Sequence, residues 1–141
     1  MLRLPKTLDQ LEMITLNDIL DERSRFGDRV RTTPMMASAP FSKMSGRNVF
    51  LKAENMQRTG SFKIRGALNV LSRLEGQPVV AASAGNHAQG VALAASIAGS
   101  PCTVFMPTIA PIPKITATQE YGATVILHGR SVADAVEAVS C

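Results

Sequence analysis

The sequence predicts an α/β fold in which a parallel sheet is flanked by helices. Strand and helix patterns alternate along residues 79–141 of the 141-residue chain. Hydrophobic residues make up 45% of the chain and charged residues 18%, a balance that allows a buried core. Alternating strands and helices imply parallel strands joined by right-handed crossovers. Ligands of such sheets bind at the carboxyl ends of the strands, where loops lead into helix N-termini.

Three elements are predicted before residue 60. A helix begins after Thr15, because Thr15 is an N-cap residue with Asp18 at the capping-box spacing, and Gly27 ends it. A short helix is expected over residues 38–44. Residues 48–54 alternate between the two faces of a strand, which predicts a strand there.

The next helix is expected to begin at Ser61, a candidate N-cap. Its apolar residues recur at i, i+3, i+4, i+7 and i+10, which describes one buried stripe. The stripe consists of Ile64, Ala67, Leu68, Leu71 and Leu74. We expect it to face a part of a sheet that this chain does not encode.

The second half contains the alternating pattern. The strands are expected over residues 79–83, 102–106 and 123–127, and the helices over residues 88–98, 114–121 and from Ser131 onward, where Asp134 completes a capping box. The charge balance changes near residue 75. Residues 1–73 carry 13 Lys and Arg against 7 Asp and Glu, whereas residues 74–141 carry 2 against 4. We therefore predict one lobe over 1–73 and a smaller α/β lobe over 74–141.

Composition argues against several classes of function. The basic first half is compatible with a nucleic-acid partner, but aromatic residues are only 4% and the basic residues are interspersed with acidic ones. We therefore expect no nucleic-acid partner. The apolar runs are too short for a membrane span and the N-terminus has no apolar signal core, which predicts a cytoplasmic protein without a membrane partner.

Metal and triad sites have little support in the sequence. His87 and His128 show neither the HExxH spacing nor a third ligand, so no metal site is expected. Ser83, His87 and Asp134 could be combined into a triad, but no GxSxG turn selects them. Cys102 lies in an apolar strand pattern and is expected in the core.

The first stretch that could carry chemistry is residues 59–66, TGSFKIRG. Lys63 falls in the first turn of the expected helix, where the positive end of the helix dipole favours the neutral amine. A neutral amine attacks carbonyl groups. The same turn has free backbone N–H groups for an anion. Most lysines in first turns are surface residues, however, and the spacing alone does not decide between the two interpretations.

The second stretch is the loop Ser83, Ala84, Gly85, Asn86 and His87. It joins a strand to a helix N-terminus, and its N–H groups and small side chains can form an anion site of the size of a carboxylate. It matches neither the GxxxxGK nor the GxGxxG pattern. The alternative is an ordinary strand-to-helix turn that is capped by Asn86.

Together the two stretches resemble a known family. Residues 54–67, ENMQRTGSFKIRGA, look like the pyridoxal-phosphate lysine segment of the threonine dehydratase (threonine ammonia-lyase) and serine dehydratase family. Residues 82–92, ASAGNHAQGVA, resemble its asparagine loop, and Ala110-Pro111 with Lys114 also fits its pattern. The resemblance covers nearly all of the chain after Met13. It implies fold-type II of the pyridoxal-phosphate enzymes, the tryptophan synthase β-like fold.

The resemblance also implies roles for individual residues. Lys63 would hold pyridoxal 5'-phosphate covalently, Phe62 would pack near its ring, and Asn86 would bind its phenolic oxygen. The substrate carboxylate would be bound by the loop residues Ser83, Ala84, Gly85, Asn86 and His87. The implied lyase reaction is β-elimination from L-threonine or L-serine, with Lys63 taking the Cα proton and a 2-oxo acid and ammonia as products. Threonine catabolism and isoleucine biosynthesis use this reaction, and the full-length members are expected to be homo-oligomers.

Two positions separate related families. Cysteine and threonine synthases carry Asp directly after the lysine, where this chain has Ile64. Serine racemases carry a second Ser in the asparagine loop, where this chain has Ala84, which cannot transfer a proton. Elimination is therefore favoured over racemisation, and a serine racemase-type enzyme remains the alternative. A choice between threonine and serine depends on a pocket for one methyl group, worth about 1–3 kcal/mol.

The chain also departs from the family. The glycine-rich loop for the cofactor phosphate and the residue that meets the pyridine nitrogen should follow the last helix, and neither is present in this sequence. We therefore expect a fragment that, alone, binds the cofactor poorly and turns over little threonine. The alternative is a catalytically dead truncated relative that serves as an interaction module.

Overall fold

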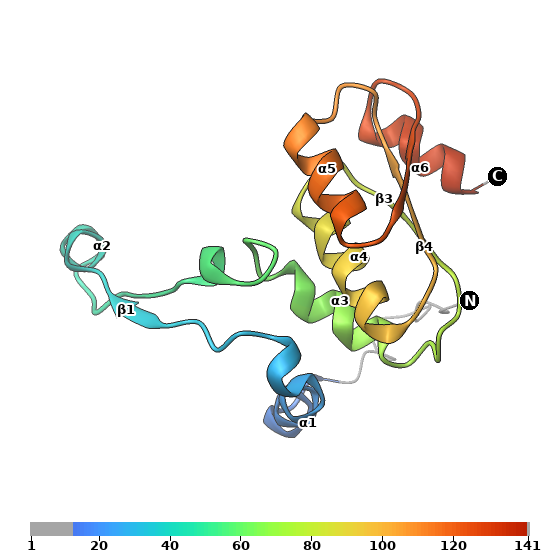
Figure 1. Ribbon diagram of the computed structural model, residues 1–141. Helices are drawn as coiled ribbons and strands as arrows, with labels where there is room; N and C mark the ends of the chain where they lie inside the picture. Colours follow the sequence, from blue (N-terminus) through green and yellow to red (C-terminus); the bar gives the residue numbers. More distant parts are fainter. Residues whose placement is uncertain (1–12, 141) are drawn as a thin grey trace.

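The computed structural model describes residues 13–140. Two parts of this range stand out as a body and a projecting arm (Figure 1). The body comprises residues 63–140, and the arm comprises residues 34–53. The body contains a three-stranded parallel sheet in the order β3-β4-β5. Its strands are β3 (Val79–Ala82), β4 (Cys102–Met106) and β5 (Thr124–Leu127). The predicted α/β fold with a parallel sheet is confirmed, and each of the three strands predicted for this sheet agrees with the structure to within one residue.

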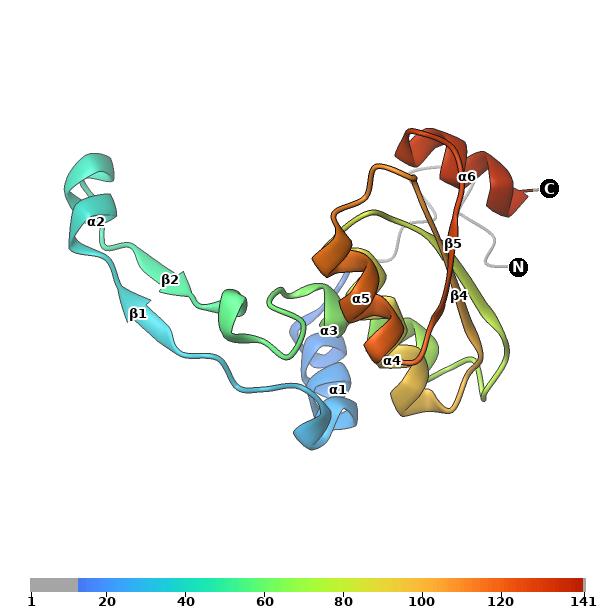
Figure 2. The ribbon, with the colours of Figure 1, turned by 45° about the horizontal axis from the view of Figure 1, so that its top comes forward.

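Helices cover both faces of this sheet. On one face lie α4 (Asn86–Ala98) and α5 (Ile112–Glu120), with α3 (Lys63–Leu71) packed against α4. On the other face α6 (Val132–Ser140) crosses β3 and β4 (Figures 1 and 2). Ser131 and Asp134 form the predicted capping box of α6, with the Asp134 amide donating to Ser131 Oγ over 3.1 Å. Val104 and Met106 of the central strand are fully buried. Cys102 is buried too, as predicted.

The apolar stripe of α3 has a partner within the body. Ile64, Leu68 and Leu71 are buried in one cluster with the Ala-rich helix α4. The expectation that this stripe faces a sheet outside the chain is therefore wrong. The small side chains of α4 let α3 approach closely enough to bury the stripe. The predicted boundary between residues 73 and 74 stays a prediction, and α3 on one side of it packs against α4 on the other.

The arm consists of a small hairpin with a helix at its tip (Figure 2). β1 (Met35–Ala37) pairs antiparallel with β2 (Phe50–Lys52), and α2 (Ala39–Ser45) lies between them in the chain. The predicted short helix is confirmed, and Gly46 ends it with a left-handed backbone. The strand predicted over 48–54 is shorter. β1 was not predicted, because three residues after Pro34 are too few for a visible alternation.

α1 (Leu16–Phe26) precedes the arm and contacts α3. Its predicted capping box is present: the Thr15 amide donates to Asp18 Oδ2 over 2.7 Å, and the Asp18 amide donates to Thr15 Oγ1 over 3.3 Å. Gly27 ends the helix as expected, and a 3₁₀ turn, η2 (Gly27–Arg29), follows. None of the helices in residues 13–140 combines the length and apolar composition that a membrane crossing requires.

Candidate active site

The two stretches singled out in the sequence meet in the body. Lys63 is the first residue of α3, and Asn86 is the first residue of α4. The start of α3 meets α4 at Gly90, the fifth residue of α4, where an added Cβ would lie 3.0 Å from the carbonyl carbon of Lys63 and 3.1 Å from the amide nitrogen of Ile64. A Cβ at these distances would be tighter than ordinary contacts, so the backbone of Lys63 would have to shift by a few tenths of an ångström to admit it. Gly90 therefore brings the lysine and the asparagine loop together.

The loop from Ser83 to Gly85 connects β3 to α4. Its Ser83 amide donates to the Phe105 carbonyl over 3.1 Å, and its Gly85 amide donates to Ser83 Oγ over 3.3 Å. Gly85 is the N-cap of α4, and no side chain caps the helix. Asn86 therefore does not act as the cap that the ordinary-turn interpretation requires. The first amides of α4 remain available to an anion.

α3 begins at Lys63, one residue later than an N-cap at Ser61 predicts. Phe62 is the N-cap residue and has a helical backbone, while the Lys63 amide makes a long bond of 3.4 Å to Ser61 Oγ. The Phe62 side chain is exposed, and Lys63 Nζ lies 5.1 Å from the centre of its ring. A cation at that distance is attracted to the face of an aromatic ring.

His87 is the second residue of α4. Partial burial lowers the pKa of His87 below its usual value of 6.5, and the positive charge of Lys63 lowers it further. The imidazole is therefore predominantly neutral at pH 7.

A second lysine belongs to this site and was not predicted as a site residue. Lys114 Nζ donates to Asn86 Oδ1 over 2.5 Å and to Gln89 Oε1 over 3.2 Å. Lys114 lies in the first turn of α5, three residues after Pro111 at the N-cap. This position is the signal that could have found it, because a cation there opposes the helix dipole just as Lys63 does.

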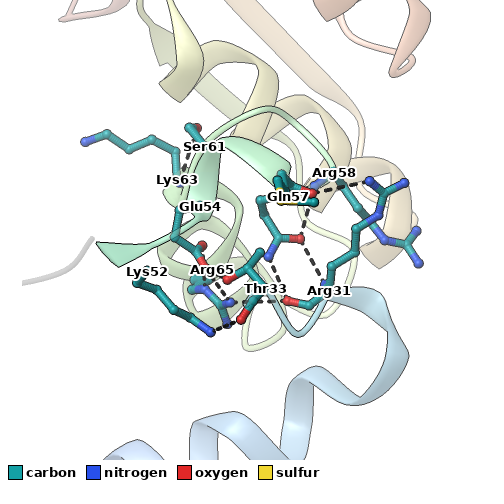
Figure 3. Close-up of polar contacts among 10 residues, drawn as sticks. Arg31, Thr33, Lys52, Glu54, Gln57, Arg58, Ser61, Lys63 and Arg65 are labelled. Atoms are coloured by element: carbon teal, nitrogen blue, oxygen red, sulfur yellow. Dashed lines mark hydrogen bonds and ion pairs between the residues drawn. The ribbon is translucent and has the colours of Figure 1, made fainter. Parts of the chain in front are cut away.

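An ion pair between Glu54 and Arg65 holds the segment that leads into α3 (Figure 3). Glu54 begins the short 3₁₀ turn η3 (Glu54–Met56), and Arg65 Nε and Nη2 donate to its two carboxylate oxygens, each over 2.9 Å. Thr33 Oγ1 adds a bond of 2.5 Å to the same carboxylate. The guanidinium of Arg65 is the main cause that lowers the pKa of Glu54 to about 2.

Gln57 fixes the next part of this segment (Figure 3). Its side chain is only 3% exposed. Its Oε1 accepts from the amides of Arg31 and Arg58 over 2.9 and 3.1 Å, and its Nε2 donates to the Arg31 carbonyl over 2.9 Å. The approach to Lys63 is therefore tied to the segment before the arm by both side chains, Glu54 and Gln57.

These donors fit one side of pyridoxal phosphate. A primary amine is suited to its aldehyde carbon, an amide N–H₂ to its phenolic oxygen, and uncapped helix amides to a substrate carboxylate. Ser83, Ala84 and Gly85 are partly buried, and the side chains of Phe62 and Lys63 are exposed, so the described loop is accessible from outside. Residues 13–140 hold no group of three or more His, Cys, Asp or Glu side chains that could bind a metal ion. Asp134, which could be combined with Ser83 and His87 into a triad, instead accepts a hydrogen bond from Ser131 Oγ at the start of α6.

Comparisons with known proteins show the family to which the chain is similar. The family model described as "Pyridoxal-phosphate dependent enzyme" matches residues 27–141. The L-threonine ammonia-lyase of Thermotoga maritima is 50% identical over 130 residues, which are 89% of this chain and 32% of that relative. The L-threo-3-hydroxyaspartate ammonia-lyase of a Pseudomonas species is 44% identical over 128 residues, which are 88% of this chain and 40% of that relative.

A solved structure gives the same result for the fold. The crystal structure of a pyridoxal 5'-phosphate-dependent aspartate racemase superimposes with a TM-score of 0.78 and 37% sequence identity, covering 90% of this chain and 41% of that chain. The chain thus spans well under half the length of the relatives it matches.

Proposed function

Because this chain belongs to the pyridoxal-phosphate dependent enzyme family, we propose that it carries the first part of the active site of an L-threonine ammonia-lyase. The reaction converts L-threonine to 2-oxobutanoate and ammonia, and L-serine is a second substrate. The main support is the close backbone contact at Gly90, which packs the start of α3, with Lys63, against α4, the helix that follows the asparagine loop. The 50% identity to an ammonia-lyase supports the type of reaction.

Each predicted site residue has a proposed task. When bound, pyridoxal phosphate supplies the electron sink that makes the Cα proton of an amino acid removable. Lys63 holds the cofactor and takes that proton, and the amide of Asn86 donates to the phenolic oxygen. The Ser83 hydroxyl and the amides of the loop up to His87, including Ala84 and Gly85, bind the carboxylate. Phe62 packs beside the ring, a task that its contact with Lys63 Nζ supports.

A racemase is the second candidate, because the aspartate racemase structure is a close structural neighbour. A racemase must deliver a proton to the face opposite the lysine, and the methyl group of Ala84 has none to give. Elimination is therefore the better-supported proposal. Its substrate class is the β-hydroxy amino acids, since the relative from Pseudomonas is named for 3-hydroxyaspartate. Homo-oligomeric assembly, a cytoplasmic location and the division into lobes 1–73 and 74–141 stay predictions.

The test of the cofactor role is covalent capture. The 141-residue chain is incubated with pyridoxal phosphate, reduced with borohydride and mapped by mass spectrometry. We expect preferential labelling of Lys63 over Lys43, an exposed lysine of the arm, and weaker labelling of Lys63 in Asn86→Ala. Equal labelling of the two lysines would contradict a cofactor site in this chain. Because the chain spans 32% of the Thermotoga relative, we expect negligible release of 2-oxobutanoate from it alone.

A further inference from the structure

The inference starts from the charge on Lys114. Its ammonium lies in the first turn of α5, where the helix dipole is unfavourable for a cation. In the part of the chain that the structure describes, no ion pair includes Lys114. The acceptors of its side chain are two amide oxygens of α4, those of Asn86 and Gln89. Gln89 is buried, so one of these acceptors is held in place by packing.

The bond to Lys114 determines how the Asn86 amide is oriented. An ammonium is donor-only, so it can face the oxygen of an asparagine amide but not its N–H₂ group. With Oδ1 directed at Lys114, Nδ2 is left as the free donor of Asn86. Rotating the amide by half a turn would set two donors against each other and lose a charge-assisted bond. Asn86 is therefore held in the orientation that donates to an acceptor oxygen.

We propose that Lys114 is a positioning residue that fixes the Asn86 amide with its N–H₂ free for an acceptor oxygen of the bound ligand. This inference rests on the proposed function, in which the acceptor is the phenolic oxygen of pyridoxal phosphate. Lys114 acts through Asn86 and does not touch the ligand. Removal of its charge should therefore weaken capture of the cofactor only while Asn86 is present.

The first test needs no cofactor. In the ¹⁵N-labelled chain, the side-chain amide signals of Asn86 are assigned by their loss in Asn86→Asp. Lys114→Met should shift these signals toward the chemical shifts of an asparagine side chain that has no fixed orientation. Lys114→Arg should keep them near the wild-type position. Lys114→Gln is a second neutral variant, and whichever neutral variant folds decides the test. Signals that stay unchanged in it would overturn the proposal.

The second test measures the pyridoxal phosphate concentration that labels half of Lys63. Lys114→Met should raise it about tenfold, the order expected for losing one charged hydrogen bond. Lys114→Arg should stay within about twofold of wild type. Arg47→Met, which removes one positive charge from the arm, is the matched charge control and should have no effect. Labelling of Lys43 serves as the internal reference in every variant.

A double-mutant cycle separates action through Asn86 from direct attraction of the anionic cofactor. In the Asn86→Ala background, Lys114→Met should cause no further loss. A second tenfold loss there would show that Lys114 acts on the ligand directly and would overturn the proposal. If the wild-type chain labels Lys63 no better than Lys43, the proposed cofactor site fails, and the amide signals still test the contact between Lys114 and Asn86.

Discussion

The body of this chain buries many of its apolar side chains, whereas the arm leaves most of its apolar side chains exposed. In the body, α3, α4 and the sheet bury a continuous core whose members include Ile64 and Val104, both fully shielded from solvent. In the arm, the apolar side chains of the hairpin and of α2 are largely exposed: Met35, Met36, Phe41, Met44, Phe50 and Leu51. Apolar side chains thus form a core only where helices and strands pack on one another.

This difference indicates where the stability of the chain comes from. Burial of apolar surface is the main favourable contribution to folding, so the body should account for nearly all of it. Within the arm, β1 and β2 pair with each other, and the segments that flank the arm are held by the polar contacts of Glu54 with Arg65 and of Gln57 with Arg31. Substitutions of similar size should therefore have very different effects in the two regions.

The largest effect should come from the centre of the body. Ile64→Ala should lower the free energy of unfolding by about 2 to 4 kcal/mol, because Ile64 is fully buried and its loss leaves a cavity. Chemical denaturation measures the change. Val70→Ala, at an exposed position of the same helix, is the control and should change it by less than about 0.5 kcal/mol. Equal losses at the two positions would contradict a core centred on the α3–α4 contact.

The next effect should come from the contact between the start of α3 and α4. Gly90→Ala should destabilise the body by about 2 kcal/mol, because the new Cβ would press on the backbone of Lys63. It should also reduce capture of pyridoxal phosphate at Lys63, since the start of α3 must move away from α4. Gly66→Ala is the matched control: the added Cβ has open space in α3 and should stabilise the helix by about 0.5–1 kcal/mol. A harmless Gly90→Ala would refute the close contact.

A smaller effect should come from the junction of arm and body. The pKa of Glu54 is about 2 in the folded chain, against 4.5 ordinarily. The ion pair with Arg65 therefore stabilises the fold fully above about pH 4.5 and loses its contribution as the pH falls toward 2. Glu54→Gln should cost about 1 to 2 kcal/mol at pH 7 and almost nothing near pH 2. Denaturation curves at both pH values measure this, and a cost independent of pH would contradict it.

The smallest effect should come from the arm itself. Phe50→Ala should lower the free energy of unfolding by less than about 0.5 kcal/mol, because its side chain is exposed in the hairpin. Thermal unfolding followed by circular dichroism, with Ile64→Ala in parallel, provides the measurement. A loss as large as that of Ile64→Ala would mean that the arm is buried in solution, and it would remove the distinction between the two regions.

Local signals in the sequence were sufficient for most of the fold. Thr15 with Asp18 and Ser131 with Asp134 identify two helix starts, because a capping box involves only neighbouring residues. The strand over Cys102–Met106 was predicted at its observed bounds, since a buried central strand is a continuous apolar run. Such features depend on the residues of one segment alone.

The remaining features depend on contacts between segments. The partner of the α3 stripe is α4, and nothing in the stripe itself distinguishes an Ala-rich helix from a sheet. The Lys63 and Asn86 segments were singled out by local patterns and assigned roles through their resemblance to a family, whereas the bond from Lys114 to Asn86 joins residues 28 positions apart. The spacing of residues along the chain does not predict such a contact.

The order of the strands has a consequence for how the chain folds during synthesis. β3, β4 and β5 pair in the order in which they are made, and each crossover closes a loop of only about twenty residues. Pairing over short separations favours fast folding. The arm leaves the ribosome earlier, yet its apolar side chains find few neighbours then or later. The arm, although it is made before the body, should thus be the later of the two to be sheltered from water.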